Sequence, residues 1–196
     1  MNKIMLATQN KDKLKEFQAL LRPFHFHPIP PPKKLPVLET GNTFRANALL
    51  KAKAYGRFFG LPVIADDSGL CIDYLNGRPG INSHRFALNG FPAARQKILK
   101  LMQHLPQSQR TAQFVCCLAY FNPQTKNCRI FTGKTKGFIA GKEIGRNGFG
   151  YDPIFFCPDL NKTFGEASSA QKNQFSHRAK ALKKLLTFLK QSAVPK

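Results

Sequence analysis

Short apolar runs alternate along this chain with stretches that place apolar residues at helical spacing. Residues 3–7 and 61–65 are compact apolar runs, which are typical of buried strands. Residues 10–21 have the pattern of an amphipathic helix, and a longer helix is predicted from about residue 43 through residue 59. The first third of the chain therefore predicts strands that alternate with helices.

The second half of the chain adds a hairpin and two more helices. Residues 93–104 return to a helical pattern, and residues 111–121 and 127–138 are β-rich runs separated by a turn. A last amphipathic helix is predicted to open at Ser176. Its inward face consists of Leu182, Leu185, Leu186 and Leu189. This order of elements predicts a mixed α/β fold.

Three stretches without a clear period are interpreted as irregular connections. Residues 25–36 contain five prolines, residues 76–85 are rich in turn formers and arginine, and residues 162–173 are polar. A loop as long as the second of these is commonly functional or mobile. Residues 70–74 are predicted to form a strand that returns from a turn at residues 66–69. No internal repeat is evident, and 196 residues fit one sizeable domain or two closely packed lobes.

The composition adds a strong positive charge to this picture. Lysine and arginine number 31 against 10 acidic residues, which gives a formal net charge of +21. Such a charge favours a polyanionic partner: a nucleic acid, a phosphorylated small molecule or a membrane surface. The charge is not gathered into one tail, and no RNA- or DNA-binding signature is present. A nucleotide substrate and a nucleic-acid surface therefore both remain open.

The cysteines and the N-terminus indicate where the protein works. Five cysteines without any CxxC pair indicate reduced core thiols rather than disulfides or zinc ligands. No stretch approaches the roughly 20 apolar residues of a membrane span. The first seven residues are too short for the apolar region of a signal peptide, and no convincing cleavage site follows them. We expect a cytoplasmic protein without a membrane partner.

Asp66-Asp67-Ser68-Gly69 is the most unusual stretch of the chain. Two adjacent carboxylates follow a short apolar run, although the chain has only 10 acidic residues in total. Like charges at the end of a buried strand are costly unless a cation or hydrogen-bond donors offset them, and a divalent metal is the simplest offset. Gly69 would let the backbone turn closely around a bound group. The alternative is an Asx-turn on the surface between two strands.

The turn after the first predicted strand is a candidate phosphate site. It consists of Thr8, Gln9, Asn10, Lys11, Asp12 and Lys13. Free N–H groups and the helix dipole at such a position attract phosphate. The turn lacks the glycines of a P-loop, and an ordinary helix cap followed by solvated lysines is the alternative. Glu39 precedes the next helix, where a carboxylate is either a cap partner or a metal ligand.

A glycine-rich stretch around Phe149 is a candidate for nucleobase binding. Its glycines free the ring of Phe149 to present a face to a base, and Asp152 could accept hydrogen bonds from a base edge. The alternative is a turn in which Phe149 and Tyr151 only pack. His177 and Arg178 lie near the start of the last helix, where the dipole disfavours positive charge. A local conflict of this kind is expected at a binding site.

Several separated stretches match one family when they are taken together. They are Ala7-Thr8-Gln9-Asn10 with Lys13; Glu39-Thr40-Gly41 with Thr43-Phe44, Asn47-Ala48 and Lys51-Ala52; Ala65-Asp66-Asp67-Ser68-Gly69-Leu70; Pro79-Gly80; Phe149-Gly150-Tyr151-Asp152-Pro153; and Lys172 with Ser176-His177-Arg178-Ala179-Lys180-Ala181-Leu182. Each is weakly specific alone, but they follow the family's order along the whole chain. The chain thus resembles the inosine/xanthosine triphosphate pyrophosphatases, which remove deaminated purine nucleotides from the triphosphate pool.

This resemblance implies both an architecture and a reaction. The architecture is a mixed central sheet flanked by helices, with the active site in a cleft between two lobes, and usually a homodimer. The reaction is the Mg²⁺-dependent hydrolysis of ITP, dITP or XTP to the monophosphate and pyrophosphate, by attack of water at the α-phosphorus. No stable nucleic-acid partner is expected for such an enzyme.

The resemblance also implies a role for individual residues. Asp67 would be the general base, and the metal ligands would be Glu39, Asp66 and Asp67. The implied substrate-binding residues are Thr8, Gln9, Asn10, Lys11, Asp12, Lys13, Lys51, Ser68, Phe149, Gly150, Tyr151, Asp152, Lys172, His177 and Arg178. Among these, Thr8, Asn10 and the two lysines Lys13 and Lys51 would hold the phosphates. Arg178 and backbone N–H groups would select a 6-oxo purine over adenine.

Three positions depart from the family pattern. Gln9 stands where members often carry glycine, Leu38 replaces an acid often found before Glu39, and His84 interrupts a Ser-Ala-Arg run. The resemblance does not explain the high basic charge either. Two other functions stay open: a basic nucleic-acid-binding protein with a degenerate nucleotide pocket, and a pyrophosphatase for modified pyrimidine nucleotides.

Overall fold

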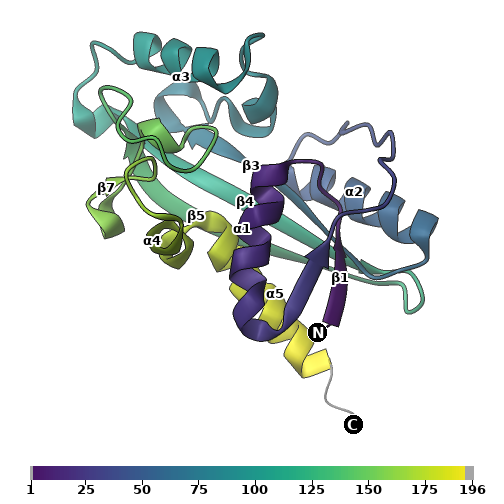
Figure 1. The fold of residues 1–196 in the computed structure, drawn as a ribbon. Coiled ribbons are helices and arrows are strands. Elements are labelled where there is room, and N and C mark those ends of the chain that lie inside the picture. The colour runs from purple at the N-terminus through teal and green to yellow at the C-terminus, as the bar shows by residue number, and fades with distance from the viewer. Residues whose placement is uncertain (1, 193–196) are drawn as a thin grey trace. The chain divides into compact units, whose positions relative to one another are not determined.

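The computed structural model describes residues 2–192, with side chains from residue 4 to residue 191 (Figure 1). The described residues form one seven-stranded sheet in the order β2-β1-β3-β4-β5-β6-β7. The strands are β1 (Asn2–Leu6), β2 (Phe26–Ile29), β3 (Val63–Ile72), β4 (Thr111–Asn122), β5 (Asn127–Ile139), β6 (Phe155–Cys157) and β7 (Lys162–Thr163). The α-helices are α1 (Lys11–Leu21), α2 (Phe44–Phe59), α3 (Gly90–Leu101), α4 (Ser169–Phe175) and α5 (His177–Ser192).

The sheet is mixed, as predicted. β1 runs parallel to β2 and to β3, whereas β6 runs antiparallel to β5 and to β7. The predicted α/β class is therefore confirmed, as are the strands and the turn of the β4–β5 hairpin. All five cysteines are free, and three of them are buried. No helix in the described part of the chain has the length and apolar character needed to cross a membrane.

The chain divides into two compact units, each assembled from separate segments. Unit 1 contains the residues up to Asp67, Cys116–Gly133 and the residues from Arg178 onward. Unit 2 contains Ser68–Val115 and Lys134–His177. Strands β3, β4 and β5 therefore contribute residues to both units. Each unit has its own hydrophobic core.

The core of unit 1 joins α1 and α5 to the strands of the sheet. Phe17 and Leu21 of α1 are buried there, together with Leu182 and Leu185 of α5 and Ile64 of β3. Each such side chain contributes about 1.5–3 kcal/mol through the burial of apolar area. The predicted inward face of the last helix is thereby confirmed, although its outermost leucine is only half-buried.

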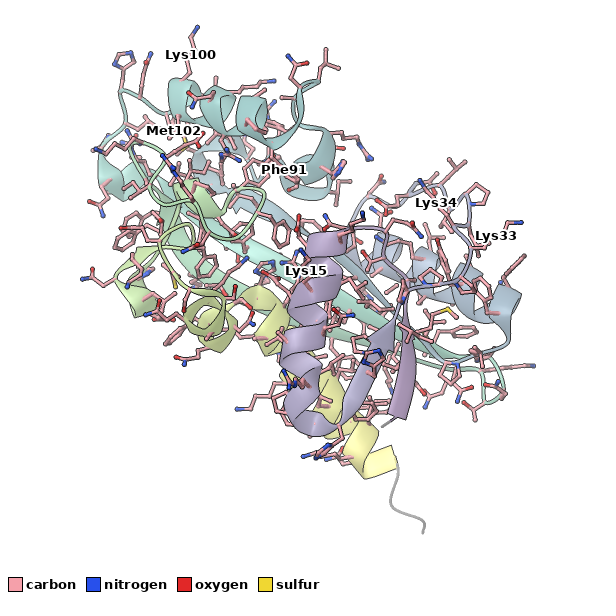
Figure 2. The ribbon with its side chains drawn as sticks, viewed as in Figure 1. Lys15, Lys33, Lys34, Phe91, Lys100 and Met102 are labelled. Atoms are coloured by element: carbon pink, nitrogen blue, oxygen red, sulfur yellow. The ribbon has the colours of Figure 1, made fainter. Side chains whose placement is uncertain are left out.

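The core of unit 2 is built around aromatic rings. The ring of Phe114 lies 4.6 Å from that of Phe155 and 6.0 Å from that of Phe164, measured between centroids. Ile98 of α3 belongs to the same cluster. So does Met102, which follows that helix and is labelled in Figure 2. This core supports the strands and loops that carry the nucleobase-binding candidates of unit 2.

β3 corrects the prediction for the stretch that contains the two aspartates. The sequence pattern predicts two strands joined by a turn at residues 66–69, whereas the structure has one continuous ten-residue strand. Asp66 and Asp67 are only 2% and 7% exposed, so the surface Asx-turn is wrong as well. The strand can continue because lysines from two helices offset the two charges.

Residues 25–36 contain a strand that the proline-rich composition conceals. β2 pairs in parallel with β1, and Pro28 lies opposite Ile4. Because β2 is at the edge of the sheet, the N–H that proline lacks is not needed on the open side. The prediction of a wholly irregular connection is therefore wrong.

Residues 162–173 contain β7 and the start of α4 instead of a polar loop. Ser168 Oγ accepts a hydrogen bond from the N–H of Gln171 at 3.2 Å, and the Gln171 side chain accepts one from the N–H of Ser168 at 3.0 Å. This reciprocal capping box starts a helix within a polar stretch. Residues 76–85 are also partly regular, because they include a 3₁₀ helix over Gly80–Arg85.

Candidate active site

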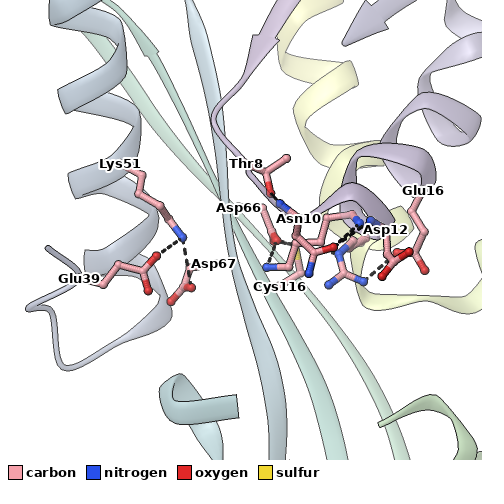
Figure 3. Close-up of polar contacts among 11 residues, drawn as sticks. Thr8, Asn10, Asp12, Glu16, Glu39, Lys51, Asp66, Asp67 and Cys116 are labelled. Atoms are coloured by element: carbon pink, nitrogen blue, oxygen red, sulfur yellow. Dashed lines mark hydrogen bonds and ion pairs between the residues drawn. The ribbon is translucent and has the colours of Figure 1, made fainter. Parts of the chain in front are cut away.

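Asp66 and Asp67 point to opposite sides of β3, because successive residues of a strand alternate. Asp66 faces α1, and Asp67 faces α2 (Figure 3). Both helices and this half of β3 belong to unit 1. The two carboxylates therefore meet different partners although they are adjacent in sequence.

Asp66 belongs to a charge-balanced network inside unit 1. Its Oδ2 lies 2.6 Å from Lys13 Nζ and 3.9 Å from Arg178 Nε, and its Oδ1 accepts a hydrogen bond from the Cys116 thiol at 3.1 Å. Arg178 also pairs with Glu16, at 2.7 Å. Burial on its own would raise the pKa of Asp66, but Lys13 and Arg178 outweigh it and hold that pKa well below its ordinary value. Two carboxylates thus face two cations.

Asp67 has a less complete set of partners. Lys51 Nζ lies 3.4 Å from its Oδ1, whereas its Oδ2 is buried and meets no hydrogen-bond donor among the described residues. The same ammonium is closer to Glu39, at 2.7 Å from Oε1. Burial raises the pKa of Asp67 to about 6, although the charge of Lys51 acts against this. One ammonium thus serves two carboxylates.

The start of α2 brings Lys51 and Glu39 together. Thr43 caps this helix, so the cap role considered for Glu39 is wrong. The buried Asn47 side chain accepts a hydrogen bond from the N–H of Gly41 at 2.8 Å, which fixes the segment that carries Glu39. Lys51 follows Asn47 by one helical turn. Burial would lower the pKa of Lys51, but the two carboxylates raise it above its ordinary value.

The turn between β1 and α1 makes the contacts of a helix cap. Asn10 Oδ1 accepts hydrogen bonds from the N–H groups of Asp12 and Lys13, at 2.9 and 3.0 Å. Thr8 Oγ1 accepts one from the N–H of Asn10 at 3.2 Å. The helix cap of that alternative is thereby confirmed, but Lys13 is not a solvated lysine, because it pairs with the buried Asp66 at 2.6 Å. Phosphate binding by this turn stays a prediction. The exposed residues of the turn are Gln9, Lys11 and Asp12.

Unit 2 carries a second buried ion pair. Asp152 Oδ2 lies 2.6 Å from Lys172 Nζ and accepts a hydrogen bond from the N–H of Phe149 at 2.8 Å. Lys172 Nζ also lies over the Phe149 ring, 4.7 Å from its centroid. Asp152 and Lys172 are both almost completely buried. The three residues form one cluster that holds the glycine-rich loop and the orientation of its aromatic ring.

The remaining candidates of unit 2 that have described contacts make hydrogen bonds and a ring stack inside that unit. The hydroxyl of the buried Tyr151 donates to the carbonyl of Ser83 at 2.8 Å, and burial raises the pKa of Tyr151. The carbonyl of Gly150 accepts a hydrogen bond from Arg95 at 2.9 Å. The buried His177 ring stacks on a core phenylalanine, with centroids 4.7 Å apart and planes 9° from parallel. Ser68 lies half-buried in β3.

Within the two units the predicted residues gather into three groups. These are Glu39, Lys51 and Asp67; Lys13, Asp66 and Arg178; and Phe149, Asp152 and Lys172. The prediction missed Glu16 and Cys116. Glu16 follows Lys13 by three residues on α1, a spacing that signals a shared helix face. Cys116 lies in an ordinary apolar strand pattern and carries no such signal.

Two carboxylates that converge on one lysine raise the question of a metal site. The described residues contain no group of three or more histidine, cysteine, aspartate or glutamate side chains that could hold a metal ion. Magnesium, however, is usually held by one or two carboxylates together with water and substrate phosphates. Glu39 and Asp67 fit that requirement, since Asp67 keeps one buried oxygen without a donor. Asp66 fits it less well, because two cations already offset its charge, and its metal role stays a prediction.

The three departures from the family pattern lie outside these groups. Leu38 is 79% exposed, and Gln9 is exposed as well. The exposed His84 ring meets Phe91 edge-on, with centroids 5.6 Å apart. In the described part of the chain, neither the ring contact of His84 nor the exposed positions of Leu38 and Gln9 involve a predicted catalytic or metal-binding residue.

Comparisons of the sequence connect it to known proteins. The sequence model of the Ham1 family matches residues 4–188. A dITP/XTP pyrophosphatase of Photorhabdus laumondii subsp. laumondii is 45% identical over 198 residues, which cover 97% of this chain and 99% of that protein. A dITP/XTP pyrophosphatase of Listeria innocua is 42% identical over 190 residues, which cover 94% of this chain and 93% of that protein.

Comparisons of the fold lead to proteins of the same kind. The Ham1 protein of Staphylococcus aureus superposes with a TM-score of 0.85 at 38% identity, covering 97% of this chain and 100% of that chain. A nucleoside-triphosphatase / dITP/XTP pyrophosphatase from Mycobacterium abscessus superposes with a TM-score of 0.75 at 36% identity, covering 94% of this chain and 98% of that chain. Sequence and fold therefore agree over nearly the full length.

Proposed function

This chain belongs to the Ham1 family, and from that membership we propose that it hydrolyses dITP, XTP and ITP to the monophosphate and pyrophosphate. Relatives named dITP/XTP pyrophosphatase are 42% and 45% identical to it over nearly their whole length. The structural observation that carries the proposal is the buried Asp67 carboxylate, with one oxygen near Lys51 and the other without a donor. Such a reaction would keep deaminated purines out of DNA and RNA.

The phosphates of the substrate are assigned to lysines and to the start of α1. Attack of water on the α-phosphorus builds negative charge on the phosphoryl oxygens, and preorganised cations stabilise that charge. Lys51 and Lys13 supply such cations from two helices. Thr8 and Asn10 lie at the N-terminus of α1, where the helix dipole favours an anion.

Asp67 is assigned as the general base. A base works best when its pKa lies near the working pH, and in the metal-free protein burial raises the pKa of Asp67 to about 6. The carboxylate is then mostly ionised at neutral pH and can still take a proton. Its free oxygen would orient the attacking water and accept that proton.

Glu39 and Asp67 would hold a divalent cation, which we take to be Mg²⁺. Bound there, Mg²⁺ would offset the charge that develops on the phosphoryl oxygens. The two carboxylates outnumber the one ammonium between them, so their own charge favours such a cation.

The sugar and base are assigned to a further set of residues. The cluster of Asp152 and Lys172 fixes the loop that carries Phe149. A loop held in this way would keep the Phe149 ring in position to stack on a flat base. Arg178 would donate to a 6-oxo purine, and an amino group in that place would leave buried polar atoms unpaired, at a cost of about 1–3 kcal/mol each. The further residues in this assignment are Ser68, Gly150, Tyr151 and His177.

The proposal includes the wider setting of the enzyme. We take the chain to act as one domain, as a homodimer and in the cytoplasm. The cleft between two lobes stays a prediction from the resemblance. Sedimentation of the purified protein tests the dimer directly, and a monomer at micromolar concentration would contradict that part of the proposal.

A substrate panel scored for pyrophosphate tests the reaction. With Mg²⁺ present, dITP, ITP and XTP should be cleaved to monophosphate and pyrophosphate far faster than ATP or dATP. Asp67→Asn should lower kcat by about 100-fold or more, because a general base typically contributes 10²–10⁴. Orthophosphate as the first product, or full activity of the Asp67→Asn variant, would contradict the mechanism.

The same panel separates the rival functions. Faster cleavage of modified pyrimidine nucleotides would favour a pyrimidine pyrophosphatase. Little turnover of any nucleotide, together with salt-sensitive retention on DNA or RNA, would favour a nucleic-acid-binding protein.

A further inference from the structure

The ammonium of Lys51 lies where the two carboxylates assigned to the metal converge. It is 2.7 Å from Glu39 and 3.4 Å from Asp67, and its side chain is only 14% exposed. In the part of the chain that the structure describes, these are the ion pairs that Lys51 makes. The group carries one positive charge against two negative charges, and one oxygen of Asp67 meets no donor.

The network on the other side of β3 differs in this respect. Asp66 and Glu16 face Lys13 and Arg178, so two negative charges meet two positive charges. A divalent cation would find little uncompensated negative charge on that side of the strand. Among the ion pairs described for the two sides of the strand, the excess of carboxylates over cations lies on the side that faces α2.

We propose that Lys51 is a placeholder, whose ammonium competes with the divalent cation for Glu39 and Asp67 until the phosphates of the nucleotide draw it away. Metal and nucleotide then bind cooperatively. The identity of the nucleotide rests on the function proposed above, whereas the competition itself rests only on the Lys51 contacts.

The competition follows from the cost of burying charge. A largely buried ammonium that loses its carboxylates must find another anion or return to water, because an unpaired buried charge is strongly destabilising. A metal that arrives alone has to displace Lys51 without offering it a new partner. A nucleotide offers phosphate oxygens, and the long flexible lysine side chain can move to them. The two carboxylates are then released to the cation.

The scheme predicts a reciprocal coupling between the two ligands. If nucleotide tightens metal binding by some factor, metal must tighten nucleotide binding by the same factor. Couplings of this kind typically amount to about 5–150-fold. Removing the ammonium should let the metal bind tightly without nucleotide, so that the part of the coupling that passes through Lys51 is lost.

Binding of Mn²⁺ alone tests the placeholder role. Free Mn²⁺ is followed by electron paramagnetic resonance in titrations of the wild-type protein and of Lys51→Gln, without nucleotide. The Kd for Mn²⁺ should fall by about 5-fold or more in Lys51→Gln, which is the low end of typical couplings. Lys51→Arg keeps the charge and should bind Mn²⁺ as weakly as the wild type.

Lys53→Gln is the matched control. Lys53 lies two residues further along α2, on another side of the helix, and the substitution removes the same charge. It should leave the Kd close to the wild-type value, which separates competition at the carboxylates from a general change in charge. Circular dichroism and Tm establish that each variant is folded, and Lys51→Met serves as a second variant if Lys51→Gln is not.

Two results would overturn the proposal. One is an equal Kd for Mn²⁺ in the wild type, Lys51→Gln and Lys53→Gln. The other is weaker binding, or none, in a folded Lys51→Gln variant, which would make Lys51 a support of the site. These measurements involve no turnover. A protein that fails to cleave dITP but shows tighter binding in Lys51→Gln would contradict the proposed function and keep the placeholder.

Discussion

Asp66 and Asp67 show how one residue step along a strand separates two chemical environments. Asp66 lies among Lys13, Arg178 and the Cys116 thiol, and its negative charge is stabilised. Asp67 shares one lysine with Glu39, and its negative charge is disfavoured by burial. Two side chains of the same type should therefore respond to pH and to substitution with opposite signs.

Asp67→Asn should stabilise the metal-free protein at neutral and alkaline pH. The pKa of Asp67 is raised from 3.8 to about 6 in the folded state, so the folded protein binds the proton more tightly. That contribution to stability is complete below the ordinary pKa and is lost as pH rises through about 6. Asparagine does not ionise, so the variant avoids the stability that the wild type loses when Asp67 becomes charged. Its free energy of unfolding should therefore exceed that of the wild type by about 2 kcal/mol near pH 8.

Thermal unfolding in EDTA at a series of pH values measures this difference. The gain should shrink toward zero as the pH falls below the ordinary pKa of aspartate, where the side chain is protonated in both the folded and the unfolded state. Asp66→Asn is the control with the opposite sign. The folded-state pKa of Asp66 is depressed, so the ionised Asp66 stabilises the folded protein at pH values above its ordinary pKa. The free energy of unfolding of the Asp66→Asn variant should therefore be lower than that of the wild type by about 3 kcal/mol or more at pH 7. Equal effects of the two substitutions would contradict the assigned environments.

The residue pattern was enough to find part of this site. The adjacent acids are conspicuous in a chain with 10 acidic residues, Glu39 is a candidate from its place before a helix, and the resemblance supplies a role for Lys51. It could not show which acid meets which cation, because that depends on the continuous course of β3. Cys116 could not be found either, since a thiol inside an apolar strand has the pattern of any core residue.

At the scale of elements, the errors of prediction have a common cause. Residues 25–36 and 162–173 were assigned as irregular because proline and polar residues dominate them. β2 tolerates its proline because it is an edge strand, and α4 starts at a capping box. The long amphipathic helices and the β4–β5 hairpin were predicted because their periodicity is visible locally. The position of a strand at the edge of a sheet and the neighbours it has across the sheet are not visible in the local sequence.

Removal of the capping box should weaken α4 measurably. Ser168→Ala deletes the side chain that accepts from the N–H of Gln171, and such losses cost about 1 kcal/mol. The Tm should fall by about 2–4 °C in a chain of this size. Ser168→Asp restores an acceptor and should recover most of the loss. An unchanged Tm for the alanine variant would show that the cap contributes nothing.

The approach of β6 to β5 leaves no space for a side chain at Gly137. A Cβ there would lie 2.2 Å from the carbonyl oxygen of Phe156 and 2.8 Å from the ring of Phe155. Since backbone on the neighbouring strand must move, Gly137→Ala should cost about 2 kcal/mol or more. Gly141→Ala is the matched control, because a Cβ there meets nothing within 4 Å. Urea denaturation distinguishes the two variants, and equal midpoints would contradict the close approach.

For the molecule as a whole, ion pairing leaves few acidic side chains to offset the unpaired lysines and arginines at the surface. Six of the 10 acidic residues pair with lysine or arginine in the described part of the chain. They are Glu16, Glu39, Asp66, Asp67, Glu143 and Asp152. Many lysines, by contrast, extend from the surface, among them Lys15, Lys33, Lys34 and Lys100 (Figure 2). The field outside the protein is therefore strongly positive.

This field should speed the capture of a polyanionic substrate. Raising KCl from about 50 to about 500 mM screens such attraction, so kcat/KM for dITP should fall by about 10-fold while kcat changes much less. Replacing Lys33 and Lys34 by glutamate should make the dependence on salt shallower. A kcat/KM that is flat across this range would show that the charge has no part in substrate capture.

The route of the chain through unit 1 has a consequence for its biosynthesis. The unit joins the segment up to Asp67 to residues that begin at Arg178, and the network around Asp66 requires both Lys13 and Arg178. During translation the aspartates emerge from the ribosome more than a hundred residues before that arginine. The nascent chain must therefore carry an incomplete charge network until synthesis has passed residue 178.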